Sequence, residues 1–174
     1  QVNTQRDFLT QEELMKIQSF DFSSNLSLDK VKDLFVFSCY TGLRFSDAQD
    51  LKQKDVHLSD EVNYIYRKQN KTNEVVQIPL HHIVLQILKK YDNDERKILG
   101  KLLPQISNQK LNTYIKMVGE LVGIKKTLTH HVARHTCATI LLNQGVSMSV
   151  VQRILGHENI RTTQIYAKIL NSTV

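Results

Sequence analysis

The stretch Thr129-His130-His131-Val132-Ala133-Arg134-His135-Thr136 decides how the rest of the chain is interpreted. Thr129 is a good N-cap residue, and the apolar positions behind it recur at helical spacing. A helix start offers unpaired N–H groups and the positive end of the helix dipole, so it favours a phosphate and disfavours a cation. His131 and Arg134 in this first turn therefore suggest an anion site, although each alone could be an ordinary core or surface residue.

A metal site is the competing interpretation of the same stretch. His131 and His135 stand four residues apart, the spacing at which two histidines on one helix face bind zinc. The hydrolytic zinc motif also needs a Glu after the first His, whereas this chain has Val132. The sequence has no P-loop and no acidic metal cluster either, so we expect no metal, no cofactor and no zinc hydrolase.

The composition is that of one globular domain with a basic surplus. The chain has 174 residues, of which 41% are hydrophobic and 23% charged. Its net charge is +6, which favours an anionic partner, with nucleic acid first and a membrane surface second, although solubility alone could explain it. No apolar run approaches the roughly 20 residues of a membrane span. Cys39 and Cys137 lie in apolar helical patterns and are interpreted as buried thiols in a reducing cytosol.

The hydrophobic periodicity predicts a mainly α protein with a small antiparallel β-sheet, an α+β fold. Thr10 and Glu13 form a capping box before the first helix, and Gly42 ends the second. Residues 62–67 alternate as a strand, 68–74 form a turn and 75–78 return, which predicts a hairpin. The further helices expected are a second one opened by Ser27, a short one capped by Ser46-Asp47, and others over 82–91, 111–122, 129–144, 147–155 and from about 161, with 92–106 irregular.

Cations also stand far from the opening stretch. Arg44 directly follows the predicted end of a helix at Gly42, where it could be a solvated loop residue. The hairpin carries Arg67, Lys68 and Lys71 at or beside its tip. The combination and order of these cations, together with the His131–Arg134 turn, decides how they are interpreted.

The order of these groups resembles the catalytic signature of the tyrosine recombinases, also called phage integrases. The matching segments are Thr41-Gly42-Leu43-Arg44, the lysine hairpin, Thr129-x-His131-x-x-Arg134-His135, Leu155-Gly156-His157 and Thr162-Thr163-x-x-Tyr166. The resemblance covers nearly the whole chain. It implies the catalytic domain of a site-specific DNA recombinase or integrase.

The resemblance also implies roles for single residues. Arg44, Arg134 and His157 would bind the scissile phosphate, and Tyr166 would attack it to form a 3′-phosphotyrosyl link. His131 is the candidate base for the phenol. The hairpin lysine would protonate the departing 5′-oxygen; Lys71 is preferred over Lys68.

Four further residues are expected to support this set. Asp47 would orient Arg44 or a neighbour, and His135 could do the same beside Arg134, with a core histidine as its alternative. Arg67 and Lys68 are expected to contact double-stranded DNA. The alternative functions are DNA relaxation of the type IB topoisomerase kind and an inactive DNA-binding relative.

The organisation expected from the resemblance is a single catalytic domain over residues 1–174. The N-terminal DNA-clamping domain usual in the family is expected to be absent from a chain that begins at Gln1. We expect a homotetramer on DNA for the full-length protein and a monomer for this chain. The expected location is the bacterial cytoplasm, on the nucleoid when bound to DNA, without a membrane partner.

Overall fold

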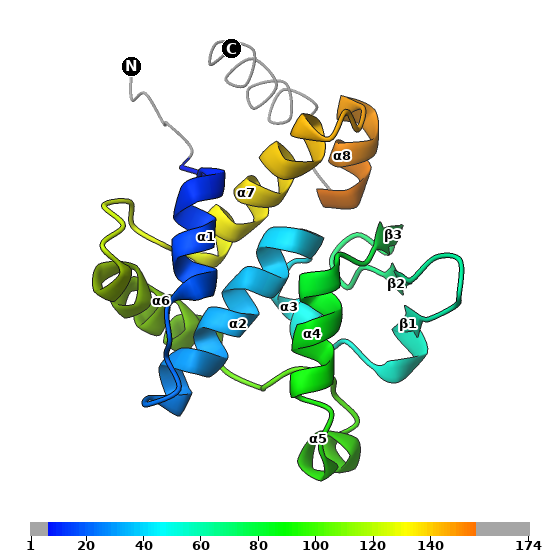
Figure 1. The fold of residues 1–174 in the computed structure, drawn as a ribbon. Coiled ribbons are helices and arrows are strands. Elements are labelled where there is room, and N and C mark those ends of the chain that lie inside the picture. The colour runs from blue at the N-terminus through cyan, green and yellow to red at the C-terminus, as the bar shows by residue number, and fades with distance from the viewer. Residues whose placement is uncertain (1–6, 156–174) are drawn as a thin grey trace.

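The computed structural model describes residues 7–155, and this part of the chain is mainly helical with one small sheet (Figure 1). The predicted fold class is therefore confirmed. In chain order the elements are α1 (Gln11–Ser19), α2 (Leu26–Thr41), α3 (Phe45–Gln49), the 3-10 turn η1 (Gln53–Asp55), β1 (Val56–His57), β2 (Tyr64–Lys68), β3 (Val75–Pro79), α4 (His82–Lys90), α5 (Asp94–Leu99), α6 (Asn108–Val122), α7 (His130–Asn143) and α8 (Met148–Leu155).

The predicted helix boundaries with clear capping chemistry are confirmed. Thr10 and Glu13 form the capping box of α1, with N···O distances of 3.1 and 3.0 Å. Thr129 caps α7 by accepting a hydrogen bond from the Val132 amide at 3.3 Å. Gly42 ends α2 in the left-handed conformation, with φ at 68°.

Helix α2 is the centre of the fold. It packs against α7, α6 and α4, which surround it in Figure 1. Buried side chains, among them Phe35, Phe37 and Cys39, lie on most of its surface, as expected of a helix enclosed by others. Cys39 and Cys137 are both buried free thiols, as predicted.

The sheet is antiparallel, in the order β1-β2-β3. The predicted hairpin of β2 and β3 is confirmed, with Ile65 opposite Ile78. Along β2, Ile65 and Arg67 face the interior, whereas Tyr66 and Lys68 are exposed. The alternation therefore places Arg67 and Lys68 on opposite faces of the sheet.

Four local predictions differ from the structure. Asn25, not Ser27, caps α2, and α3 begins directly after Arg44. The two-residue strand β1 is too short to produce an alternating pattern. Helix α5 lies in the stretch predicted to be irregular; it has its own signals, an Asn93 N-cap and Gly100 in the left-handed conformation after its end.

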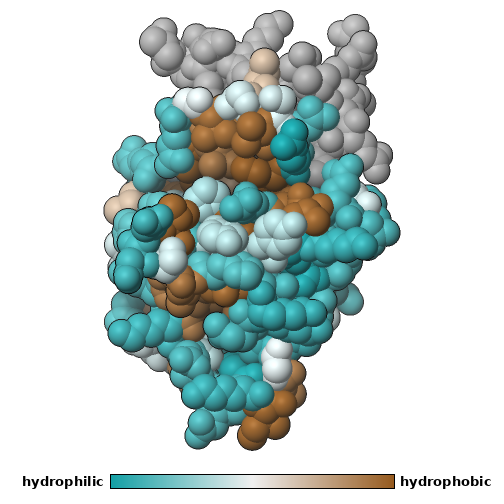
Figure 2. Space-filling view, turned by 90° about the vertical axis from the view of Figure 1, so that its right-hand side faces the viewer, coloured by the Kyte–Doolittle hydropathy of each residue, from teal (hydrophilic) through white to brown (hydrophobic). Residues whose placement is uncertain are grey.

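One face of the described part of the chain is largely polar. On the face that Figure 2 presents, teal residues dominate, with brown surface at the top beside the grey residues and at the bottom. Exposed apolar side chains occur on α8 (Met148 and Val150) and on α5 (Ile98 and Leu99). Within residues 7–155, no helix combines the length and apolar character needed to cross a bilayer.

Candidate active site

The segment Gly42–Arg44 meets helix α7, although about ninety residues separate them in the sequence. The Arg134 Nε–H donates to the Gly42 carbonyl at 2.9 Å, and Nη2–H donates to the Leu155 carbonyl at the end of α8. His130 Nε2 lies 3.1 Å from the Leu43 carbonyl. We call this contact region, made of Gly42–Arg44, His130 and Arg134, the α2–α7 junction. It brings the first arginine stretch to the second, as predicted.

Gly42 permits this close approach in two ways. Its φ of 68° is one that side-chain-bearing residues rarely adopt. A Cβ atom at this position would lie 2.5 Å from Leu155 Cδ2 and 3.2 Å from Cys137 Sγ. The absence of a side chain therefore lets α7 and α8 pack directly on the end of α2.

His130 is the neutral member of the junction. Its side chain is 7% exposed and its ring lies edge-on to Phe45 at 5.8 Å. Burial, with the charge of Arg134 as a smaller cause, lowers its pKa to about 4. Because a carbonyl oxygen only accepts, Nε2 carries the proton that is donated to Leu43. His130 therefore acts as a fixed hydrogen-bond donor at neutral pH.

The two other histidines of α7 lie at different depths. His131 is exposed in the first turn, while His135 is half-buried one turn later, with 6.3 Å between the ring centroids. His135 Nδ1 lies 3.3 Å from the carbonyl oxygen of Asp7 near the start of the described chain. His131 is thus placed to meet a ligand from solvent, and His135 contacts the N-terminal segment.

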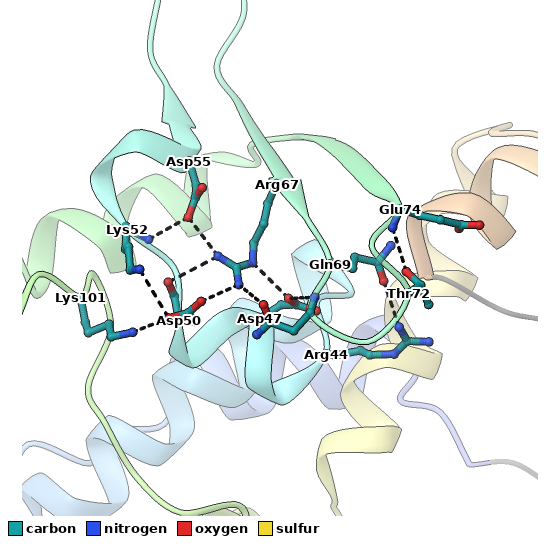
Figure 3. Close-up of polar contacts among 11 residues, drawn as sticks. Arg44, Asp47, Asp50, Lys52, Asp55, Arg67, Gln69, Thr72, Glu74 and Lys101 are labelled. Atoms are coloured by element: carbon teal, nitrogen blue, oxygen red, sulfur yellow. Dashed lines mark hydrogen bonds and ion pairs between the residues drawn. The ribbon is translucent and has the colours of Figure 1, made fainter.

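The β2–β3 turn reaches the junction through Gln69. The Arg44 Nη1–H donates to Gln69 Oε1 at 3.1 Å (Figure 3). Gln69 is only 3% exposed, and its main chain bonds to Glu74 and Asn73 at 2.9 and 3.0 Å. The turn that carries Lys71 is therefore fixed beside Arg44.

Arg67 is buried, whereas the expected contact with DNA needs an exposed side chain. Its side chain is 6% exposed, and its guanidinium is enclosed by acceptors (Figure 3). Three N–H groups donate to carboxylates: Nε to Asp47 at 3.1 Å, Nη2 to Asp50 at 2.8 Å and Nη1 to Asp55 at 3.2 Å. Nη2 also donates to Asn70 Oδ1 at 2.9 Å. We call Arg67 and these three carboxylates the hairpin network.

Asp47, which was expected to orient Arg44 or a neighbour, belongs to this network. Asp47 is fully buried, and one oxygen, Oδ1, accepts from both Arg67 and the Asn70 amide, the latter at 2.9 Å. Asp47 therefore binds a neighbouring arginine, Arg67, and the hairpin turn rather than Arg44. Hydrogen bonds from Lys101 and then Arg67 lower the pKa of the adjacent Asp50 to about 2.

Both candidate lysines are exposed. Lys68 ends β2 opposite Val75, on the outer face of the sheet. Lys71 follows in the turn, two residues after the glutamine that contacts Arg44. The other predicted catalytic residues, His157 and Tyr166, lie outside the described residues.

The sequence interpretation missed two residues of the site, His130 and Gln69. No sequence signal separates His130, the buried neutral donor, from its exposed neighbour His131. Gln69 is a polar turn residue whose contact with Arg44 depends on the register of the hairpin. Only the tertiary arrangement reveals either role.

Residues 7–155 also contain a cavity away from this region and no cluster of metal ligands. In this range, no group of three or more His, Cys, Asp or Glu side chains could hold a metal ion. A cavity of about 650 Å³ lies between α4, α5 and the β1 region, lined in part by Leu85, Tyr91 and Arg96. The described candidate residues are not among those that line it.

The fold is that of the tyrosine recombinase catalytic region. The structure of a XerH site-specific recombinase bound to a palindromic difH substrate, in a post-cleavage complex, superimposes with a TM-score of 0.76 at 23% identity, over 94% of this chain and 50% of that one. A lambda integrase dimer bound to a core site gives a TM-score of 0.68 at 23% identity, over 96% and 61%.

Sequence comparison assigns the family. The phage integrase family model matches residues 7–172, so the chain belongs to the phage integrase family. It is 36% identical to a tyrosine recombinase of Agathobacter rectalis over 74% of the chain and 44% of that protein. It is 30% identical to the tyrosine recombinase XerA of Thermococcus onnurineus, over 92% of the chain and 57% of that protein. The chain therefore spans about half the length of these relatives.

Proposed function

We propose that this chain is the catalytic domain of a site-specific DNA recombinase or integrase. The observation that carries the proposal is the α2–α7 junction. There Arg44 and Arg134 belong to segments that are held together by hydrogen bonds from the Arg134 and His130 side chains to backbone carbonyls. The β2–β3 turn with Lys71 is fixed to Arg44 by Gln69. Membership of the phage integrase family supports the same function.

In the proposed reaction, Arg44 and Arg134 bind the non-bridging oxygens of one DNA phosphate. A guanidinium presents two parallel N–H groups, which match a phosphate better than an ammonium does. His157 supplies a further donor. The charge on these oxygens must be stabilised in the transition state, and the loss of one such donor typically costs about 10²- to 10³-fold in rate.

Tyr166 is the proposed nucleophile. Its oxygen forms a bond to phosphorus while the bond from phosphorus to the 5′-oxygen breaks, which leaves a 3′-phosphotyrosine and a 5′-hydroxyl. A free phenol has a pKa of about 10, so it needs a base, for which the exposed His131 is the candidate. Lys71 gives its proton to the departing oxygen. One phosphodiester bond is exchanged for another, so the step balances without ATP or a metal.

The proposed partner is double-stranded DNA. The net charge of +6 favours it, and the XerH and lambda integrase structures that resemble this fold are DNA complexes. A homotetramer on DNA is proposed for the full-length protein and a monomer for this chain, acting in the cytoplasm. Lys68 on the exposed face of the sheet is proposed as a DNA contact.

A nicked DNA substrate tests the reaction, because the short 5′-hydroxyl strand diffuses away and traps the cleaved state. The wild-type chain should form a covalent adduct that survives denaturing electrophoresis, and Tyr166→Phe should form none. An adduct that persists in Tyr166→Phe would show that another residue is the nucleophile.

A second substrate tests the proton donor. A 5′-bridging sulfur leaves without protonation, so Lys71→Ala should cleave this DNA near the wild-type rate but should be impaired on normal DNA. Lys68→Ala is the matched control, expected to lose binding rather than this selectivity. Equal loss by Lys71→Ala on both substrates would point to a binding role for Lys71 or to Lys68 as the proton donor.

A further inference from the structure

Gln69 stands out because it is a buried side chain that links two parts of the candidate site. Its amide oxygen accepts from Arg44 Nη1 at 3.1 Å, and its exposed fraction is 3%. Figure 3 shows the Gln69 side chain between the turn and Arg44. The amide Nε2 is buried without a hydrogen-bond partner. Burying an amide in this way is unfavourable, so glutamine at this position carries an energetic cost.

The main chain of Gln69 is fixed as firmly as its side chain. Its N–H donates to the Glu74 carbonyl at 2.9 Å, and its carbonyl accepts from Asn73 at 3.0 Å. The next residue, Asn70, is held by both Asp47 and Arg67. The main chain at Gln69 and Asn70 is therefore fixed, and the buried Gln69 side chain extends from it to Arg44. An acceptor carried by a fixed backbone can set where the Arg44 guanidinium lies.

We propose that Gln69 is a positioning residue that fixes the Arg44 guanidinium relative to the lysine-bearing turn. The inference rests on the proposed function, since it concerns the geometry in which Arg44 meets the phosphate. Arg44 follows Gly42 and Leu43 at the end of α2, and its side chain has several rotatable bonds. A fixed acceptor reduces the number of its orientations before DNA arrives, and a misplacement near 1 Å can cost about 100-fold in rate.

The first variant is Gln69→Met, which removes the acceptor and nearly keeps the volume. We expect the rate of adduct formation on nicked DNA to fall about ten- to a hundred-fold, with the thermal midpoint close to that of the wild type. Gln69→Glu restores an acceptor toward Arg44 and should recover part of the rate. Gln77→Met on β3, an exposed position of the same hairpin, is the control and should match the wild type.

Combining Gln69→Met with Arg44→Ala tests whether Gln69 acts through Arg44. If Gln69 acts through Arg44, the double variant should be no slower than Arg44→Ala alone. The 5′-bridging sulfur substrate should fail to rescue Gln69→Met, although it rescues Lys71→Ala. Additive losses, or rescue by the sulfur substrate, would overturn the proposal and connect Gln69 to the lysine instead.

An NMR measurement that needs no DNA cleavage tests this inference independently of the proposed function. The guanidinium ¹⁵N–¹H signals of Arg44, assigned with Arg44→Lys, should show slower Nη rotation in the DNA-free wild-type chain than in Gln69→Met. Identical signals in both would overturn the inference. If the wild type forms no adduct, the proposed function fails, and these signals still decide whether Gln69 holds Arg44.

Discussion

At the α2–α7 junction, arginine and histidine side chains donate to backbone carbonyls, whereas in the hairpin network a buried arginine donates to carboxylates. The first region depends on close packing of helices around a glycine. The second depends on charges removed from water, where the loss of one partner is costly because it leaves an uncompensated buried charge. The same candidate site is therefore held on one side by shape and on the other by charge.

The largest effect is expected from breaking the hairpin network. Arg67→Met leaves buried carboxylates without their cation, Asp47 being fully buried, and should lower the free energy of unfolding by about 3 to 5 kcal/mol. Urea denaturation measures this loss. Lys52→Met is the control, since its contact with Asp50 is 3.9 Å long and partly exposed. A loss below about 1 kcal/mol for Arg67→Met would mean that charge does not hold the hairpin.

A methyl group at the glycine tests the junction. Gly42→Ala adds a Cβ within 2.5 Å of Leu155 and forces a positive φ on alanine, so we expect a loss of about 3 to 4 kcal/mol. Gly100→Ala is the matched control, because its φ is 69° but nothing lies within 4 Å of the added atom. Equal losses in the two variants would show that strain alone matters and that close packing does not.

The α2–α7 junction and the hairpin network should lose stability in different pH ranges as the pH falls. His130 has a pKa of about 4 in the folded chain against 6.5 as its reference, so its contribution is complete above 6.5 and is lost as the pH falls toward 4. The expected loss is up to about 3 kcal/mol. The Asp50 pKa is lowered from 3.8 to about 2, so the contribution of this carboxylate is lost only below 3.8.

The free energy of unfolding, measured against pH, checks this order. His130→Asn should flatten the curve between pH 6.5 and 4 and leave the lower range unchanged. A His130→Asn curve that keeps the wild-type slope in the upper window would contradict the assignment.

The smallest expected effect concerns the helix start that carries His131 and Arg134. Thr129→Ala removes the side-chain acceptor for the Val132 amide and should cost about 1 kcal/mol. Thermal denaturation is sensitive enough to measure it. Thr129→Ser keeps the hydroxyl and should stay near the wild type. A Thr129→Ser loss equal to that of Thr129→Ala would show that the cap is not the cause.

The junction was the more predictable region because its signals are local. Gly42 as a helix end and Thr129 as a helix start follow from the chemistry of single residues. The meeting of their segments followed only from the family resemblance. The structure supplies its physical basis in the bonds of Arg134 and His130 to carbonyls.

The hairpin network could not be predicted in the same way. Arg67 stands beside Lys68 and looks equally suited to DNA in the sequence. Its burial depends on carboxylates from α3 and from the segment that follows it, which converge only in the folded chain. Strand alternation indicates opposite faces for the two cations but does not say which face is covered.

The central claim is that Arg44 and Arg134, from distant segments, act on one phosphate. It is tested most directly with nicked DNA in which a methyl group replaces one non-bridging oxygen of the scissile phosphate and removes its charge. The rate of covalent adduct formation is measured for the wild type, Arg44→Ala and Arg134→Ala. Each alanine variant should lose about 10²- to 10³-fold on normal DNA and much less on the neutral substrate. Losses of the same size on both substrates would contradict the claim.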